Sequence, residues 1–155
     1  MAIDSGFYYK LFPKDVNLFR AMDVNPPDNI CHLAQTGNLS GQLWRIAPAG
    51  NGFFTLSTQF RGPDMCADIF NGGPNDAQVH LTRRGNLSGQ SWLIRETSEP
   101  PPFTNSFFAR LSTEFRGPDM CLDRLESGET FFVRLAARAN TARQIWLLSR
   151  TDDRV

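Results

Sequence analysis

The chain has 155 residues and a mass of 17.5 kDa, enough for one ordinary domain with a hydrophobic core but a tight fit for two. Hydrophobic residues make up 41% and charged residues 21%, and the thirteen Phe favour strands, which excludes a disordered, collagen-like or coiled-coil chain. The sixteen Lys and Arg balance the sixteen Asp and Glu, so no net charge would attract nucleic acid or an anionic membrane surface.

The first third of the chain contains four short segments with the composition of strands. They are rich in Phe, Val, Ile and Tyr, they alternate apolar and polar residues, and turn residues such as Pro26-Pro27-Asp28 separate them. The predicted strands are 7–12, 17–24, 29–35 and 43–48. A single helical turn is expected before the Gln-x-Trp that begins at Gln42, and no longer helix.

The second third repeats the first. Thr36 to Ile46 reads TGNLSGQLWRI and Arg84 to Ile94 reads RGNLSGQSWLI, so eight of eleven positions agree. The predicted strands are 53–60, 65–70, 78–84 and 91–96. Turns are expected at Gly62-Pro63-Asp64 and over residues 71–75.

The last third copies the second. Leu111 to Cys121 reads LSTEFRGPDMC and differs from Leu56 to Cys66 at one position. The predicted strands are 106–112, 120–125, 131–138 and 145–149, with a turn at Ser127-Gly128, and the tail 151–155 is expected to be loose. A third Gln-x-Trp ends this segment, so Trp44, Trp92 and Trp146 fall 48 and 54 residues apart.

Three units of about fifty residues, roughly 6–50, 51–102 and 103–150, therefore fill the chain. The run Pro100-Pro101-Pro102 marks the second boundary, because proline cannot continue a central strand. One unit could not bury its apolar face alone, whereas three hairpin-built units that close on one core leave no exposed strand edges. The sequence thus predicts one all-β domain over residues 1–155, a β-trefoil of twelve strands in three pseudo-threefold repeats.

These signatures resemble the ricin B-type lectin family, whose repeats carry Cys-Leu-Asp on an early strand and end in Gln-x-Trp. Cys121-Leu122-Asp123 matches the first signature, Cys66-Ala67-Asp68 matches it closely, and Ala21-Met22-Asp23 keeps only the aspartate. The resemblance implies a non-enzymatic lectin without a cofactor. It also implies up to three shallow, pseudo-equivalent sites for galactose-type or other sugars, with glycans or glycoconjugates as partners.

The family pocket uses this aspartate to accept hydrogen bonds from sugar hydroxyls, together with polar groups next to the Gln-x-Trp. A carboxylate suits that task because it accepts several charge-assisted hydrogen bonds, although an aspartate at a strand end can also cap a turn. Unit two is the best furnished, and unit three, with Arg143 beside its glutamine, would suit an acidic sugar or none. The carbohydrate-binding candidates are Asp23, His32, Asn38 and Gln42; Asp68, His80, Asn86 and Gln90; and Asp123, Arg134, Asn140 and Gln144.

The chain departs from the family at the stacking aromatic, where Ala34, Thr82 and Ala136 stand. None of these can stack on the apolar face of a sugar. Two residues earlier on the same strand face stand His32, His80 and Arg134, which either replace that platform in part or are solvated surface side chains. Phe70 and Asn71, just after Asp68, offer unit two a further surface beside the pocket. The three asparagines either reach the pocket or hold the turn, and the turn ranks first.

Other repeated residues suggest structural roles. The three tryptophans are expected to be core residues with the indole N–H bonded to backbone, and the glutamines to satisfy buried backbone groups as well as ligand. The three cysteines, Cys31, Cys66 and Cys121, are an odd number without a signal sequence, which favours reduced, buried thiols. The same reasoning places the protein in the cytosol, or releases it without a classical signal peptide.

No catalytic motif is present: Gly-x-Ser-x-Gly, a phosphate-cradling loop, His-Glu-x-x-His and Cys-x-x-Cys are all missing from the sequence. Neither an enzyme nor a metal site is expected, and no apolar run is long enough for membrane insertion. The rival class is a protein-binding trefoil, such as a protease inhibitor or a toxin-associated subunit, that makes contacts through loops 62–64 or 100–103. A third possibility is an accessory domain of a larger hydrolase. The sugar, the number of working sites and the oligomeric state stay open.

Overall fold

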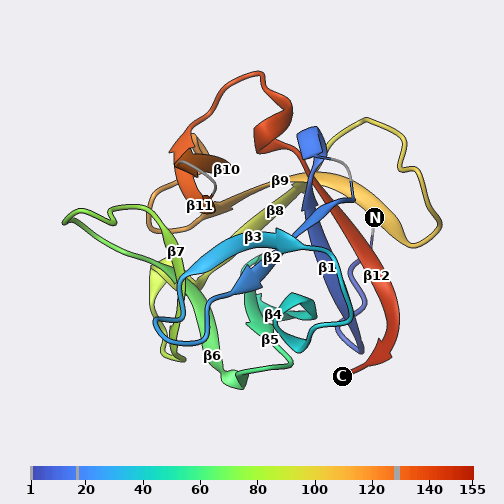
Figure 1. Cartoon of the computed structure of the whole chain (residues 1–155), viewed down its shortest axis with the longest axis horizontal. Helices are drawn as coiled ribbons and strands as arrows, with labels where there is room; N and C mark the ends of the chain where they lie inside the picture. The colour runs from blue at the N-terminus through green and yellow to red at the C-terminus, as the bar shows by residue number, and fades with distance from the viewer. Residues whose placement is uncertain (1, 17, 128–129) are drawn as a thin grey trace.

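The computed structural model describes residues 2–16, 18–127 and 130–155, which form twelve strands and four short 3-10 turns (Figure 1). The predicted all-β architecture is confirmed, and every predicted strand overlaps an observed one. The first lobe contains β1 (Phe7–Pro13), β2 (Arg20–Val24), β3 (Cys31–Gln35) and β4 (Trp44–Gly50). The second contains β5 (Phe53–Thr58), β6 (Gly62–Ile69), β7 (Val79–Arg83) and β8 (Trp92–Glu96). The third contains β9 (Ser106–Thr113), β10 (Met120–Ser127), β11 (Thr130–Ala137) and β12 (Trp146–Arg154).

The first and last strands of the three lobes form a closed barrel. In ring order the strands are β1, β4, β5, β8, β9 and β12, and β12 pairs with β1 to complete the ring. The first and last strands of the chain therefore lie side by side (Figure 1). Closure leaves no free edge on these six strands, which is the physical reason that three hairpin-built repeats form one body.

The middle strands of each lobe form antiparallel hairpins, β2–β3, β6–β7 and β10–β11, that cap the barrel. Single bridges join neighbouring hairpins at equivalent positions. They link His32 with Phe132, His80 with Ile30, and Arg134 with Gln78. The three residues expected to replace the stacking aromatic thus stand where one lobe of the cap meets the next.

The core is built from residues that recur in each repeat. Trp44, Trp92 and Trp146 have no exposed surface. Each indole N–H donates to a backbone carbonyl in the cap hairpin of its own lobe, at 2.9 Å to Met22 and at 3.0 Å to Ala67 and Leu122. These contacts confirm the predicted role of the tryptophans, since they satisfy the one polar atom of a buried ring. The three cysteines are also buried and unbridged, as expected.

The predicted helical turn before each Gln-x-Trp is present as η2 (Ser40–Gln42), η3 (Ser88–Gln90) and η4 (Ala142–Gln144). A further turn, η1 (Lys14–Val16), follows β1. These segments of the described chain are single 3-10 turns, far too short to cross a bilayer.

The expectation of a loose tail is wrong. Strand β12 continues to Arg154, which pairs with Phe7, and the backbone N–H of Val155 donates to Gly6 at 2.9 Å. The polar composition of the tail suggested a free end, but its strand partner comes from the opposite end of the chain. The beginning of the predicted strand 17–24 and the predicted turn at Gly128 fall on Asn17 and Gly128, which lie outside the described residues.

Candidate functional site

Each lobe contains the same buried pair, formed by the aspartate of the cap hairpin and the glutamine of Gln-x-Trp. In lobe two the Gln90 amide nitrogen donates to Asp68 Oδ2 at 3.3 Å and to the Arg83 carbonyl at 2.9 Å. Its carbonyl oxygen accepts from the Gly85 backbone at 2.9 Å. The equivalent amide-to-carboxylate bonds are 3.1 Å from Gln42 to Asp23 and 3.2 Å from Gln144 to Asp123.

The three glutamines are at most 1% exposed, and both amide hydrogens of each are donated inside the protein. They have no donor left for a ligand. Their role is to hold the carboxylate and the turn before Gln-x-Trp in fixed positions. As predicted, the glutamine of each lobe forms hydrogen bonds with buried backbone groups. Direct contact between a glutamine and a sugar stays a prediction.

The three aspartates differ in exposure. Asp23 is 7% exposed and Asp123 is 3% exposed, whereas Asp68 is half-buried. In every lobe Oδ1 accepts from the backbone N–H of the next residue, at 2.7 to 2.8 Å. Each carboxylate thus has the local backbone role that the sequence left open. Among the three, Asp68 has the greatest access to a ligand.

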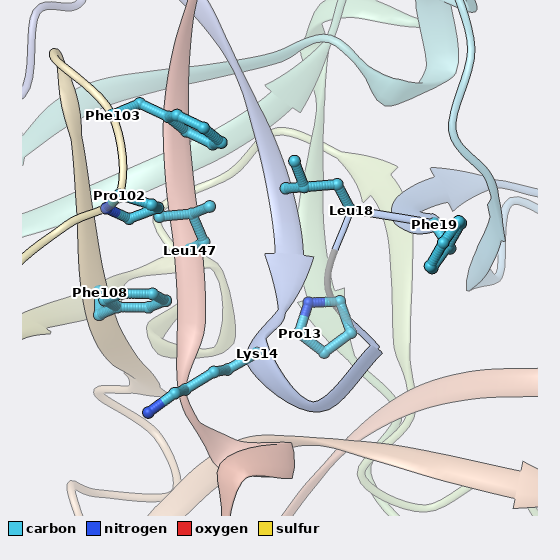
Figure 2. Close-up of a pocket in the computed structure, with 8 residues that line it drawn as sticks. All are labelled: Pro13, Lys14, Leu18, Phe19, Pro102, Phe103, Phe108 and Leu147. Atoms are coloured by element: carbon cyan, nitrogen blue, oxygen red, sulfur yellow. The ribbon is translucent and has the colours of Figure 1, made fainter.

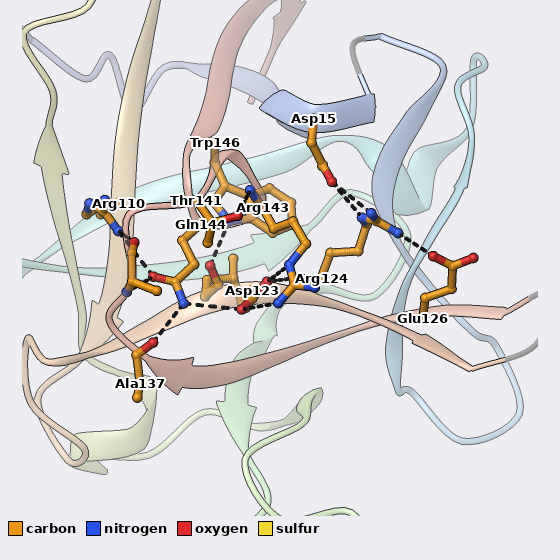
Figure 3. Close-up of polar contacts among 12 residues, drawn as sticks. Asp15, Arg110, Asp123, Arg124, Glu126, Ala137, Thr141, Arg143, Gln144 and Trp146 are labelled. Atoms are coloured by element: carbon orange, nitrogen blue, oxygen red, sulfur yellow. Dashed lines mark hydrogen bonds and ion pairs between the residues drawn. The ribbon is translucent and has the colours of Figure 1, made fainter.

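The residue before each glutamine decides what covers the carboxylate. Lobes one and two have Gly41 and Gly89, where an added Cβ would lie only 2.3 Å from Asp23 Oδ1 and Asp68 Oδ1 respectively. Lobe three has Arg143 instead, and its guanidinium is paired with Asp123, with Nε 3.2 Å from Oδ1 (Figure 3). Lobe three therefore supplies its own cation to the carboxylate that a sugar would need.

Lobe two also contains an aromatic pair beside its carboxylate. Asp68 stands directly opposite His80 in the β6–β7 ladder, so both side chains leave the hairpin on one face. The Phe70 ring stacks on His80 with centroids 3.8 Å apart and planes inclined by 10°. Burial lowers the pKa of His80, and the nearby Asp68 carboxylate opposes that shift in part. No hydrogen bond holds the His80 ring nitrogens within the described part of the chain, so the imidazole can bond a ligand.

The other lobes lack this ring pair. Asn25 and Leu125 occupy the positions of Phe70, each two residues after the aspartate. Asp23 faces His32 across the β2–β3 ladder, but His32 Nδ1 is buried without a partner. In lobe three Arg134 stands opposite Asp123 and is exposed.

The three predicted asparagines, Asn38, Asn86 and Asn140, are exposed. Asn86 and Gln90 line a hollow of about 250 Å³ against the β4–β5 hairpin, and the residues that line it do not include Asp68 or His80. The structure thus joins Asp68 with His80 and Gln90, but it places Asn86 on another side of the turn. A role in the turn remains the better interpretation for the asparagines.

Two arginines that were not among the predicted site residues brace the loops beside the candidate sites from the next lobe. Arg116 Nη2 donates to Asp76 at 2.7 Å and to Asn71 at 3.3 Å, in the loop after Phe70. Arg61, its copy in the repeated Phe-Arg-Gly-Pro-Asp segment, donates to the Pro26 carbonyl in the equivalent loop of lobe one. The duplication was visible in the sequence, but it indicated only a turn, because contacts between lobes have no signal along the chain.

A separate, apolar hollow shares no lining residue with the lobe-two site (Figure 2). Its volume is about 580 Å³, and Phe19 and Phe103 at its rim are 77% and 45% exposed. It includes Pro102 and Phe103 from the loop that the rival interpretation singled out. The lining residues are Pro13, Lys14, Leu18, Phe19, Pro102, Phe103, Phe108 and Leu147.

Within residues 2–16, 18–127 and 130–155, no cluster of three or more His, Cys, Asp or Glu side chains could hold a metal ion. The closed six-strand barrel, the three cap hairpins and the triplicated glutamine–aspartate pair define the chain as a β-trefoil protein. No protein-family model matches the sequence, and no curated protein does.

Solved structures with the same fold include lectins. The ricin B-like lectin of Macrolepiota procera in complex with lactose matches with a TM-score of 0.72 and 20% identity, over 97% of this chain and 100% of that one. The designed threefold-symmetric protein ThreeFoil matches with a TM-score of 0.74 and 20% identity, over 94% and 99%. A mosquitocidal holotoxin matches with a TM-score of 0.81 and 12% identity, and 97% of this chain corresponds to 18% of the toxin. At these identities the likeness establishes the β-trefoil fold.

Proposed function

We propose that this protein binds carbohydrate without catalysing a reaction, and that its working site is in lobe two. The observation that carries the proposal is the combination of a half-buried carboxylate, Asp68, with the stacked rings of Phe70 and His80 on one face of the β6–β7 hairpin. The lactose complex of the Macrolepiota procera lectin, which has the same fold, supports the choice of ligand class.

The chemistry of this face suits a sugar with adjacent hydroxyls. Each oxygen of Asp68 accepts one protein hydrogen bond, from Ile69 N–H or from Gln90, and retains a lone pair for a ligand hydroxyl. Phe70 supplies an apolar surface for the C–H face of a pyranose ring, such as that of a galactose-type sugar. His80 is neutral at pH 7 because of its lowered pKa, so it can either donate or accept.

The same reasoning ranks the other lobes. Lobe one has the carboxylate but no stacked ring, and Asp23 is nearly covered. Lobe three is closed to neutral sugars because Arg143 already pairs with Asp123. We therefore expect lobe two to bind more tightly than lobe one, and lobe three to bind no neutral sugar, rather than three equal sites. A single shallow site binds weakly, so useful affinity would need several protein copies on one glycan surface.

The test exchanges the residue before the glutamine between lobes. Gly89→Arg displaces Asp68 Oδ1 from the position of the new Cβ and gives lobe two the arginine that pairs with the lobe-three carboxylate, so it should abolish binding of lactose in calorimetry and on a glycan array. Asp68→Ala should do the same, whereas Asp64→Ala, which removes an exposed carboxylate from the same hairpin, should leave binding unchanged. Retained sugar binding in both Gly89→Arg and Asp68→Ala would refute the lobe-two site.

The apolar hollow beside Pro102 and Phe103 favours the second candidate, a protein-binding trefoil. The match to part of a mosquitocidal holotoxin is consistent with a domain that works inside a larger assembly. This alternative predicts no binding to any glycan on the array. It also predicts tight capture of a defined protein, such as a protease or a toxin subunit, that Phe103→Ser abolishes and Asp68→Ala does not affect.

A further inference from the structure

A second concave surface carries an unusual concentration of arginine. It is a cleft of about 420 Å³ between the β8–β9 hairpin and the segment before η4, and Arg95, Arg110 and Arg138 line it. Arg110 and Arg138 also line an adjoining hollow, which Asp119 borders. The cleft does not include any residue of the proposed sugar site in lobe two. We propose that this three-arginine cleft binds an oxyanion of the sulfate or phosphate type.

Two like charges face each other at the cleft. Arg95 stands directly opposite Arg110 in the β8–β9 ladder, and both side chains point out of the barrel because Ile94 and Leu111 point in. Opposite like charges destabilise a sheet unless something neutralises them. Among the strand pairs of the described residues, this is the only one that joins two side chains of the same charge.

Arg110 is held in position by two hydrogen bonds and keeps further donors for a ligand. Its Nη1 donates to the Ala139 carbonyl and to Gln144 Oε1, both at 3.2 Å (Figure 3). Those contacts use the two hydrogens of Nη1 and leave Nε and Nη2 without a protein acceptor in the described chain. A guanidinium that is fixed in this way presents a fork that fits two oxygens of one anion.

The carboxylates in the cleft are too few to neutralise its three arginines. Glu96 and Glu99 also line it, and Glu99 is paired with Lys14. Three arginines and Lys14 against two glutamates leave a surplus of two positive charges. Asp119, in the adjoining hollow, lies beyond ion-pair distance of Arg110 and Arg138. The walls also include Ile145, which would contact the organic part of a sulfate or phosphate ester.

The pseudo-symmetry of the fold supplies an internal comparison. The equivalent hollow in lobe two lies between the β4–β5 hairpin and the segment before η3. There the cross-strand pair is Ala47 with Thr55, and only Arg84 corresponds to one of the three arginines. Arg84 and Arg138 occupy equivalent positions in the two lobes, because their backbone N–H groups donate to the equivalent backbone carbonyls of Asp64 and Asp119. The shape therefore recurs in lobe two, whereas the cluster of three arginines does not.

The test follows the arginine Nε–Hε signals by nuclear magnetic resonance while sodium sulfate replaces sodium chloride at constant ionic strength. We expect saturable shifts at Arg95, Arg110 and Arg138 and none at Arg84. The double variant Arg95→Ala with Arg110→Thr installs the pair that lobe two already carries, so it should fold, and it should lose sulfate binding. Arg138→Ser should weaken binding about tenfold, as expected for one charge-assisted contact, and Arg84→Ser should not.

Two further probes separate the possible sources of the anion. Galactose 6-sulfate that binds more tightly than inorganic sulfate would point to a sulfated sugar, and inorganic phosphate or sulfate that binds equally well would point to a free anion. Either result supports the cleft. Linear shifts of equal size at all arginines, or undiminished sulfate binding in the double variant, would overturn it. Loss of lactose binding in the double variant would instead contradict the independence of the two sites.

Discussion

Gln90 donates a hydrogen bond from its buried amide to Asp68, and this contact joins two segments 22 residues apart in the sequence. It holds the turn before β8 against the cap hairpin β6–β7. The same glutamine satisfies the backbone at Arg83 and Gly85. Because one side chain serves both the core and the candidate carboxylate, changes to it affect stability and the site together.

Removal of the Gln90 side chain should destabilise the protein strongly. Gln90→Ala leaves a cavity and deprives the Arg83 carbonyl, the Gly85 N–H and Asp68 of their partner, so the free energy of unfolding should fall by about 3 kcal/mol. Urea denaturation measures this change. The exposed Gln59→Ala should stay within about 0.5 kcal/mol of the unchanged protein. Equal stability of the two variants would contradict a structural role for the buried amide.

The stability of the protein should decrease as the pH falls below the ordinary pKa of histidine, and His80 should contribute to that decrease. Burial lowers the pKa of His80 in the folded state from 6.5, so the unfolded chain takes up this proton first. The contribution of His80 is therefore complete above pH 6.5 and is lost as the pH falls through its folded-state pKa. The loss of unfolding free energy from about pH 7.5 to about pH 5.5 should be smaller in His80→Asn. An identical pH dependence of both proteins would disprove this assignment.

The three thiols should be unreactive in the folded protein. Cys31, Cys66 and Cys121 are buried, and burial raises the pKa of the Cys31 and Cys66 thiols, which removes the reactive thiolate. A thiol reagent such as dithiobis-nitrobenzoate should therefore react with none of them in native buffer and with all three in concentrated urea. Rapid stoichiometric reaction of the native protein would show that these side chains are accessible.

The facing pair Arg95 and Arg110 should lower the free energy of unfolding when no anion is present. Arg95→Thr removes one of two like charges that face each other across β8 and β9, so it should raise the free energy of unfolding by about 0.5 kcal/mol at low ionic strength. Salt screens this repulsion, and the gain should shrink above about 0.5 M sodium chloride. Arg84→Thr serves as the matched substitution and should produce no such gain. A stabilisation that is independent of salt would argue against repulsion as the cause.

Much of the fold was predictable because the same residue pattern occurs in all three repeats. Strand positions, the single turn before each Gln-x-Trp, the buried tryptophans and the buried cysteines follow from local alternation, turn residues and duplication. The tail was misjudged because the strand that holds Arg154 begins at Phe7, almost a full chain length away. Sequence patterns indicate local secondary-structure preference, but they do not indicate which distant segment pairs with a strand to complete a sheet.

The candidate site was predictable in part. The sequence singled out Asp68, His80 and Phe70, and the geometry of the hairpin brings these three together. It predicted that the glutamines satisfy buried backbone groups, but it could not show that both amide hydrogens of each are donated within the protein, since burial depends on how the turn packs on the cap. Nor could it show that Arg143 covers Asp123, because that ion pair joins the turn η4 to strand β10, two elements 20 residues apart in the chain.

The sequence alone determined that the chain repeats three times, alternates as strands and carries an aspartate at the same position of each repeat. Those properties are local or periodic, so they can be seen without coordinates. Only the tertiary structure decided which carboxylate remains accessible and which arginines meet in a common cleft. Accessibility and charge clustering arise from the packing of segments that are far apart in the chain, and pseudo-symmetry leaves each lobe free to differ in what surrounds the same residue.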